Sequence, residues 1–294
     1  MKKKYLNFID NNCPSLKGKT VVITGGTGGI GFHISKYLAY LGANVILAAR
    51  NKAKTEKVIC EIKELVADAK LSYKYLDLTD IKSVDDFISY LTEVKIDYLF
   101  LNSGIYHQES KLINGMDIHY MVNFFIPYKI VESLKDKFIA NKTKVIVTSS
   151  ISYMFSKIDP NDILSKNCKN KTKLYGKTKR LLTQMLYLLK EDNKGLEIAF
   201  AHPGVTASTL FEGLHTNLFW KIALPIMRHI FMSNDKASLP ILYAINHDHD
   251  NRHWIGPRGL FQVWGYPAIK KVKKDLFDIE EIKILKEKVN EIEG

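Results

Sequence analysis

The sequence has few cysteines, and they show no spacing that suggests a structural site. Cys13, Cys60 and Cys168 are the three in 294 residues. They cannot all pair with one another, and they lack the short spacings typical of a zinc site. Because disulfide-rich scaffolds form in oxidising surroundings, this usage predicts a protein of a reducing compartment, the cytoplasm.

Long apolar runs are also missing. No stretch approaches the ~20 apolar residues that span a bilayer. The basic residues 1–4 precede a segment, 5–15, that is too polar for a signal-peptide core. The composition, 46% hydrophobic and 25% charged, is that of a soluble globular protein. We therefore expect one cytoplasmic domain over residues 1–294, with at most peripheral membrane contact.

Acidic residues are in short supply relative to basic ones. The chain has 31 Asp and Glu against 43 Lys and Arg, a net charge of +12. Nucleic-acid binding would explain such a charge, but no recognition motif is present, so we expect no nucleic-acid partner. An anionic cofactor, an anionic membrane surface and a merely lysine-rich composition remain as explanations.

A glycine cluster stands between a predicted strand and a predicted helix. Residues 20–24 are a short β-branched run, typical of a buried strand, and Ile30, Ile34 and Leu38 recur at helical spacing. Glycines in this context let the backbone approach a pyrophosphate, and the helix N-terminus supplies free N–H groups. The turn therefore predicts a dinucleotide site. Its candidate residues are Gly25, Thr27, Gly28, Gly29, Ile30 and Gly31.

The end of the next strand indicates which dinucleotide binds. Residues 45–49 form a second apolar strand, followed by Arg50 and Asn51. At this position, about 20 residues past the glycines, an acid would hold the ribose of NAD, whereas an arginine suits the 2′-phosphate of NADP. No acid occurs between Gly42 and Lys54. The sequence therefore favours NADP(H) as the cofactor.

Strand and helix patterns alternate along the chain. Helical stretches at 54–69, 83–91 and 117–139 separate apolar strands at 71–76, 98–101, 144–148 and 196–200. This alternation predicts an α/β fold with a doubly wound parallel sheet of Rossmann type, whose ligands bind at the carboxyl ends of the strands. The polar and turn residues expected at those ends are Asp77, Leu78, Asn102, Ser103, Gly104, Ser150, Pro203 and Gly204.

Tyr175 and Lys179 are four residues apart at the start of another helical pattern. Residues at i and i+4 share one face of a helix. A cation about 4 Å from a phenol favours the phenolate by roughly 4 kcal/mol at an effective dielectric near 20. We therefore expect Lys179 to lower the pKa of Tyr175, so that this tyrosine can exchange protons with a substrate oxygen.

With these residues in place, the chain resembles the short-chain dehydrogenase/reductase family as far as about Val263. Thr24–Gly25, Gly29 and Gly31 fit the family's T-G-x-x-x-G-x-G turn, and residues 102–104 fit its asparagine–glycine turn. Ala48-Ala49-Arg50, residues 114–117 and the 25-residue separation of Ser150 from Tyr175 are most similar to the retinol-dehydrogenase-like reductases. Asn123, Ser150, Tyr175 and Lys179 fall on the family's catalytic tetrad.

The resemblance implies reversible hydride transfer between NADP(H) and a carbonyl or alcohol. Tyr175 would donate the proton, Ser150 would orient the substrate oxygen, and Asn123 would orient water behind Lys179. Asp77 and Leu78 would contact the adenine. The loop that begins with His202 would adjoin the nicotinamide, whose carboxamide would be held by backbone groups of Val205 and Thr206, with Ser208.

Some residues depart from the family pattern. Leu101 and Ser103 replace the usual Asn and Ala beside Asn102, and residues 124–127 replace a polar, glycine-containing run after Asn123. Gly25, Gly28 and Gly31 also fit the G-x-x-G-x-x-G turn of sugar-nucleotide-modifying relatives. A non-catalytic NADP-binding sensor or scaffold is a further alternative, although it would not need the full Asn-Ser-Tyr-Lys set.

The segment from Leu218 to Met232 is apolar almost all round, which a solvated surface helix would not be. It is too short to span a membrane. We expect residues 205–233 to form a lid over a lipophilic substrate, retinoid-, steroid- or lipid-like. Core packing or interfacial membrane contact through Phe219 and Trp220 are the alternatives.

The C-terminal residues 275–292 carry an apolar helical stripe that includes Ile282, Leu285 and Val289. The stripe suits packing on the chain's own core, residues 18–265, or association into a homodimer. The histidines at 247, 249 and 253 fit no metal-site spacing, so we expect no metal.

Overall fold

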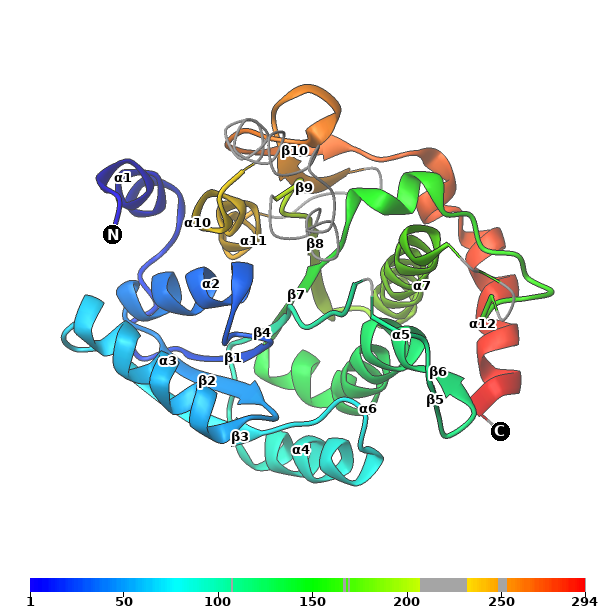
Figure 1. The fold of residues 1–294 in the computed structure, drawn as a ribbon, viewed down its shortest axis with the longest axis horizontal. Helices are drawn as coiled ribbons and strands as arrows, with labels where there is room; N and C mark the ends of the chain where they lie inside the picture. Colours follow the sequence, from blue (N-terminus) through cyan, green and yellow to red (C-terminus); the bar gives the residue numbers. More distant parts are fainter. Residues whose placement is uncertain (107, 166–167, 169, 207–231, 248–252, 294) are drawn as a thin grey trace, which may run out of the picture.

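The computed structural model describes residues 1–106, 108–165, 168, 170–206, 232–247 and 253–293, without the side chains of 292 and 293. A central sheet runs through these residues, with helices on both of its faces (Figure 1). This layering confirms the predicted α/β class and the single doubly wound Rossmann domain.

The described part of the sheet has eight strands in the order β3-β2-β1-β4-β7-β8-β9-β10. All neighbours are parallel except β9 and β10, so the sheet ends in an antiparallel edge strand that the sequence pattern did not predict. The order reverses between β1 and β4, and in open α/β sheets ligands bind at such a switch point. The strands are β1 Thr20–Thr24, β2 Asn44–Ala49, β3 Lys70–Tyr75, β4 Tyr98–Leu101, β7 Lys144–Thr148, β8 Glu197–Ala201, β9 His253–Pro257 and β10 Pro267–Lys271.

Two hydrophobic clusters fill the space between the sheet and its helices. Alternate residues of β1 point to opposite faces: Val22 belongs to one cluster, while Val21 and Ile23 belong to the other. Helices α4, α6, α7 and α12 cover the first face, and α1, α2, α3 and α11 cover the second. These helices are α1 Lys3–Asn12, α2 Gly29–Tyr40, α3 Lys52–Leu65, α4 Ile81–Glu93, α6 Ile126–Asn141, α7 Lys171–Asp192, α11 Leu239–Tyr243 and α12 Ile279–Glu293.

The helix predicted over 117–139 is present but irregular. It begins as α5 Ile118–Tyr120, widens into a π-helical turn, η1 Met121–Phe125, and continues as α6. Pro127 stands at the start of α6 and has no N–H, so it cannot form the α-helical bond to the carbonyl of Asn123, four residues earlier. The replacement of the family's usual residues after Asn123 therefore changes the local helix without breaking it.

The helix predicted over 54–69 ends four residues early, at Leu65. The Asn51 side chain accepts a hydrogen bond from the Lys54 N–H (2.9 Å) and so begins the helix at Lys52. The chain must then turn before β3, which starts at Lys70 and pairs with β2. Residues 66–69, which the helical pattern assigns to the helix, form this turn instead.

Both ends of the chain contribute to the core. The unpredicted helix α1 buries Tyr5 and Ile9 against the α2 side of the sheet. At the other end, α12 buries Ile282, Leu285 and Val289 beside α7. The C-terminal stripe therefore packs on its own domain, and it is not free to serve as an association helix.

Most of the predicted lid, including Ser208, Phe219 and Trp220, lies outside the described residues, as do His249 and its acidic neighbours. No described helix is long and apolar enough to cross a membrane. The described residues also contain no group of three or more potential metal ligands.

The remaining short elements are β5 Leu112–Ile113, β6 Met116–Asp117, η2 Ile151–Phe155, α10 Asn234–Ala237, η3 Leu260–Gln262 and η4 Lys274–Phe277.

Candidate active site

The glycine turn after β1 is built so that only glycine fits at two positions. Gly25 has a φ of 67°, and a Cβ there would lie 2.9 Å from the Cα of Ser103. A Cβ on Gly31 would lie 2.0 Å from the carbonyl oxygen of Gly25. Around a Cβ on Gly29 there is nothing within 4 Å, so the turn is open at the N-terminus of α2. These features fit a cradle for an anionic phosphate group.

Thr24 joins the glycine turn to the end of β4. Its Oγ1 accepts hydrogen bonds from the backbone N–H groups of Asn102 and Ser103, both at 3.1 Å. The Asn102 side-chain amide in turn donates to the carbonyl oxygen of Gly25 (3.1 Å). The carboxyl ends of β1 and β4 are thereby fixed to one another at the switch point of the sheet.

Two cations stand where β2 ends. Arg50 is exposed at the end of the strand. Lys54, in the first turn of α3, places its Nζ 3.5 Å from where a Cβ on Gly28 would lie. The mouth of the glycine turn therefore carries positive charge from both residues, of which the sequence pattern had identified only Arg50.

Asp77 follows β3 and holds its own turn. Its Oδ1 accepts hydrogen bonds from the Thr79 backbone N–H (2.9 Å) and hydroxyl (2.7 Å). Its backbone N–H donates to the Ser83 hydroxyl at the start of α4 (2.9 Å). Leu78 packs against the hydrophobic cluster beneath. Both residues lie at a strand end, as predicted.

Asn123 connects three elements near the end of β4. Its Oδ1 accepts from the Ile105 N–H (2.8 Å), and its Nδ2 donates to the Ile105 carbonyl (3.0 Å) and to the Thr178 hydroxyl on α7 (3.2 Å). A Cβ on Gly104 would lie 3.3 Å from both Asn123 Oδ1 and Lys179 Nζ. Gly104 thus marks the point where the Asn123 and Lys179 side chains meet.

Lys179 is buried and its ammonium group points at a strand end. The Nζ donates a hydrogen bond to the carbonyl oxygen of Thr148, the last residue of β7 (3.0 Å). Burial lowers the pKa of Lys179 to about 8, because a charged amine loses its hydration.

Ser150 and Tyr175 form the other half of the site. Ser150 caps η2, and its Oγ accepts from the Ser152 hydroxyl (2.8 Å) and backbone N–H (3.3 Å). The Ser150 side chain also lies close enough to the Tyr175 phenol to lower its pKa. The Tyr106 ring meets the Tyr175 ring edge-on, with centroids 4.9 Å apart.

The pKa of Tyr175 is raised, whereas the sequence predicts that it is lowered. Burial raises the pKa of Tyr175 to about 12; the nearby Ser150 side chain lowers it, and Tyr106 raises it further. Lys179 was expected to lower it, but that lysine is itself desolvated and directs its Nζ at Thr148. Loss of water around the phenol outweighs the attraction that the i, i+4 spacing suggested.

His202 has a structural role in the loop after β8. Its Nδ1 accepts from the Gly204 N–H (3.2 Å), which leaves the proton on Nε2 to be donated to Gln262 Oε1 (2.9 Å). Burial lowers the pKa of His202 to about 4. The imidazole is therefore neutral at pH 7 and positions the turn.

Sequence comparison agrees with this geometry. A family model described as short chain dehydrogenase matches residues 19–158, from β1 past the Ser150 turn. Retinol dehydrogenase 12 of Homo sapiens is 31% identical over 227 residues, which are 72% of this chain and 70% of that protein. The chain belongs to the short-chain dehydrogenase/reductase family. It is an oxidoreductase of retinol-dehydrogenase-like type.

Two more family members extend the comparison. Polyprenol dehydrogenase of Homo sapiens is 24% identical over 252 residues, 81% of this chain and 75% of that protein. A solved 3-oxoacyl (acyl-carrier-protein) reductase from Agrobacterium tumefaciens C58, with NADP bound, superposes with a TM-score of 0.62 at 18% identity. The superposition covers 78% of this chain and 88% of that one, and it supports the fold.

In this short-chain dehydrogenase/reductase, the four tetrad positions converge from three elements: Asn123 lies on η1, Ser150 caps η2, and α7 carries both Tyr175 and Lys179. Asn123 and Lys179 meet at Gly104, and Ser150 lies near Tyr175. The Val205 backbone, which the sequence predicts to help hold the carboxamide, is bonded within the fold. Its N–H donates to the Val263 carbonyl (2.9 Å) and its carbonyl accepts from the Met232 N–H (3.2 Å), so the N–H is already engaged.

Several residues that build this oxidoreductase's site were not found from the sequence. Lys54 could have been found, because it stands in the first helical turn after Arg50. Thr178 could have been as well, since it lies next to Lys179 and holds Asn123. Gln262 could not, because it is 60 positions away from the His202 that it binds.

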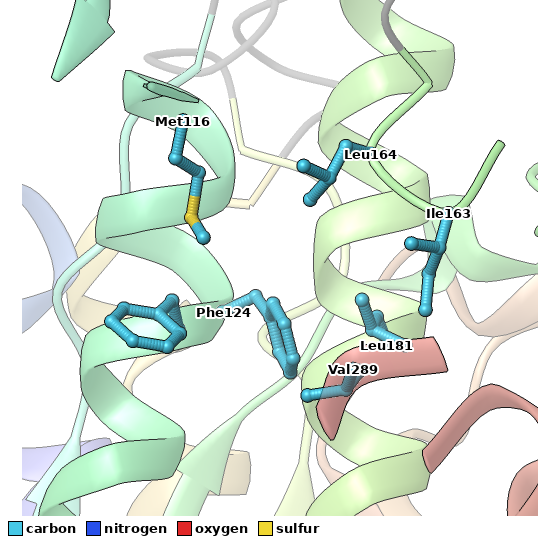
Figure 2. Close-up of a pocket in the computed structure, with 7 residues that line it drawn as sticks. Met116, Phe124, Ile163, Leu164, Leu181 and Val289 are labelled. Atoms are coloured by element: carbon cyan, nitrogen blue, oxygen red, sulfur yellow. The ribbon is translucent and has the colours of Figure 1, made fainter. Parts of the chain in front are cut away.

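A small apolar cavity lies among η1, α7 and α12 (Figure 2). It has room for a water-sized sphere, about 10 Å³. Figure 2 shows Phe124, Leu181 and Val289 directed into it from η1, α7 and α12. The cavity is a packing defect under the C-terminal helix, so it does not identify the substrate. The other lining residues are Met116, Phe125, Ile163 and Leu164.

Proposed function

We propose that this protein is an NADP(H)-dependent oxidoreductase that interconverts a lipophilic ketone or aldehyde and the corresponding alcohol. The observation that carries the proposal is the convergence of Asn123, Ser150, Tyr175 and Lys179 beside an open glycine turn with cations at its mouth. Nicotinamide, when bound, supplies the hydride. The residues that would hold the cofactor are Gly25, Thr27, Gly28, Gly29, Ile30, Gly31, Arg50, Asn51, Lys54, Asp77, Leu78, Asn102, Ser103, Gly104, Tyr175, Lys179, Pro203, Gly204, Val205, Thr206 and Ser208.

The chain's own residues move the proton. As the carbonyl carbon accepts hydride, its oxygen takes a proton from the Tyr175 hydroxyl, and the phenolate is reprotonated from solvent. Ser150, which lies near Tyr175, orients the same oxygen. The raised pKa of Tyr175 keeps the phenol protonated at pH 7, which is the form that donates.

The lipophilic class of substrate rests on the named relatives and on the sequence. The similar proteins are named for retinol and polyprenol, both long apolar alcohols. The apolar run 218–232 stands in the chain between the nicotinamide-side loop and α10. A cytoplasmic location, peripheral membrane contact and a homodimer remain proposals, as does the absence of a nucleic-acid partner.

The cofactor test compares NADPH with NADH. Arg50→Asp should lower kcat/KM with NADPH by about 10- to 100-fold, because it removes a charge-assisted bond to the 2′-phosphate and adds repulsion. Lys54→Asp should act in the same direction. The matched control is Lys52→Asp, since Lys52 lies in the same helical turn but faces solvent and pairs with Glu56 (3.8 Å). Equal efficiency of the unmutated enzyme with both cofactors would disprove the preference.

The substrate test is an NADPH-oxidation screen over retinal, steroid ketones, quinones and short polar aldehydes. We expect turnover with the bulky apolar compounds. Activity confined to short polar aldehydes would overturn the lipophilic class. Tight NADPH binding without turnover of any compound would favour the sensor or scaffold.

A further inference from the structure

The hairpin between β9 and β10 exposes three large apolar side chains. Leu260, Phe261 and Trp264 are 65%, 73% and 41% exposed, and we call them the apolar tip. The hairpin is closed by the Arg258 N–H on the Tyr266 carbonyl and the Gly259 N–H on the Trp264 carbonyl, both at 2.8 Å. It stands at the edge of the sheet, above α10 and α11 in the view of Figure 1.

The outward direction of the tip is enforced by a buried hydrogen-bond network. Gln262, between the tip residues, turns inward, and its Oε1 accepts from His202 Nε2 (2.9 Å) and Trp254 Nε1 (2.8 Å). Phe261 and Gln262 have φ angles of 50° and 58°, a conformation unfavourable for residues other than glycine. The fold thus accepts backbone strain at a place where apolar side chains face water, which points to a function for the tip.

Cations surround the base of the hairpin. The Arg258 guanidinium lies 5.7 Å and the Lys236 Nζ 5.4 Å from the centre of the Tyr266 ring. The Lys270 Nζ donates to the Arg258 carbonyl (3.0 Å). Burial lowers the pKa of Lys236, and the charge of Lys4, on α1, lowers it further because the two residues are close. The neighbouring carboxylate, Asp235, is already bound to Lys36 and Tyr37.

We propose that this hairpin docks the protein on an anionic lipid membrane, with the apolar tip inserted and Lys4, Lys236, Arg258 and Lys270 on the lipid headgroups. An apolar tip in a cationic rim is the arrangement that binds such an interface. A second copy of the chain is the alternative occupant of the exposed edge strand β10. It is disfavoured because two identical cationic rims would repel one another.

The docking surface adjoins the candidate active site. The Val263 carbonyl accepts the Val205 N–H (2.9 Å), and the Gly265 N–H donates to Met232 Sδ (3.3 Å). The hairpin is therefore bonded to the chain that follows the His202 loop. A lipophilic substrate could then reach the site directly from the lipid; this last step rests on the proposed function, whereas the docking itself does not.

The test is co-sedimentation with lipid vesicles, which needs no substrate. The full chain should bind vesicles of equal parts phosphatidylcholine and phosphatidylserine, bind vesicles of pure phosphatidylcholine more weakly, and be released by salt. The double variant Leu260→Ser, Phe261→Ser should lose at least about tenfold in vesicle affinity. Its matched control is Leu112→Ser in the β5–β6 hairpin, where the leucine is 75% exposed and should not affect binding.

A charge variant tests the second half of the proposal. Arg258→Glu with Lys236→Glu should abolish the preference for phosphatidylserine, whereas Lys52→Glu, at a site 70% exposed on α3, should preserve it. NADPH affinity and melting temperature, measured on each variant, establish that it is folded. No binding of the unmutated chain to anionic vesicles, or equal binding by the Leu260/Phe261 variant, would overturn the proposal. So would a concentration-dependent dimer that this variant disrupts without any vesicle binding, since the hairpin would then join two copies.

Discussion

Helix α7 carries two buried cations at adjacent positions, Lys179 and Arg180, and the groups that surround them differ. On the face toward the glycine turn, Lys179 donates to a backbone carbonyl at 3.0 Å, and burial lowers its pKa to about 8. On the neighbouring face, which we call the outer face, Arg180 binds the Asp275 carboxylate (3.1 Å), the Asp275 carbonyl (2.9 Å) and Glu281 (3.3 Å). Lys179 therefore keeps a costly charge available for chemistry, whereas Arg180 pairs its charge with two carboxylates through one terminal nitrogen, although its buried Nε has no partner among the described residues.

The outer face of α7 is where the C-terminal segment is attached. Besides the Arg180 pairs, the Gln184 side chain donates to the Asp275 carbonyl (3.4 Å), and the Tyr187 and Phe277 rings have centroids 4.4 Å apart. These contacts hold the helix from the side away from the active site. We infer that the contacts of Arg180, Gln184 and Tyr187 with the C-terminal segment stabilise the fold, whereas burial of the charged Lys179 destabilises it.

The largest effect should come from the inner face, by removing the Tyr175 hydroxyl. Tyr175→Phe should lower turnover by about 10²- to 10⁴-fold, because no other group donates the proton, while NADPH affinity and melting temperature stay near normal. Tyr106→Phe is the control, since it removes a hydroxyl from the neighbouring ring and should cost at most a few-fold. Near-normal turnover of Tyr175→Phe would require another proton donor.

Replacing Lys179 should separate function from stability. Lys179→Met removes a desolvated charge from a site only 2% exposed, so the free energy of unfolding at pH 7 should rise, by up to about 3 kcal/mol from the shift of the pKa to about 8. Turnover should be lost. Chemical unfolding of the two proteins measures the difference, and a variant less stable than its parent would contradict our account of the inner face.

On the outer face the same kind of change should have the opposite sign. Arg180→Met leaves Asp275 and Glu281 without their cation and should lower the free energy of unfolding by about 2–3 kcal/mol. The loss should not be larger, because these two acids are 29% and 36% exposed and water partly screens them. Turnover per folded molecule should change little. Lys283→Met, which breaks a surface pair with Glu280, should cost less than about 0.5 kcal/mol. Equal losses in both variants would show that burial of Arg180 is irrelevant.

The smallest effect is a pH dependence confined to the inner face. The folded pKa of Lys179 lies near 8, below its ordinary value, so from pH 8 upward the unfolded chain binds more protons than the native one, and stability rises with pH. Between pH 7 and 9 the parent should gain about 1 kcal/mol relative to Lys179→Met. Arg180→Met should show the same gain as the parent. A parent and Lys179→Met with parallel pH profiles would exclude Lys179 as the source.

Much of the fold was accessible from the sequence because it depends on local patterns. Short β-branched runs became the inner strands, and a glycine turn that no larger residue could form connects β1 to α2. The i, i+4 spacing set Tyr175 and Lys179 on α7, and helical periodicity indicated the buried stripe of α12. These features follow from propensity, steric exclusion and periodicity, which act over a few residues.

What only the tertiary structure decided are quantities set by distant partners. The pKa of Tyr175 rose because neighbouring elements remove its water, a term that spacing along one helix cannot report. Arg180 is compensated by residues 95 and 101 positions away, and the apolar tip is held outward by Gln262 acting on His202. α1, too polar to be noticed as a pattern, is placed by the few side chains that it buries. Burial and long-range pairing exist only once the chain has folded, so the sequence determined which groups could act, and the packing determined their charge state and exposure.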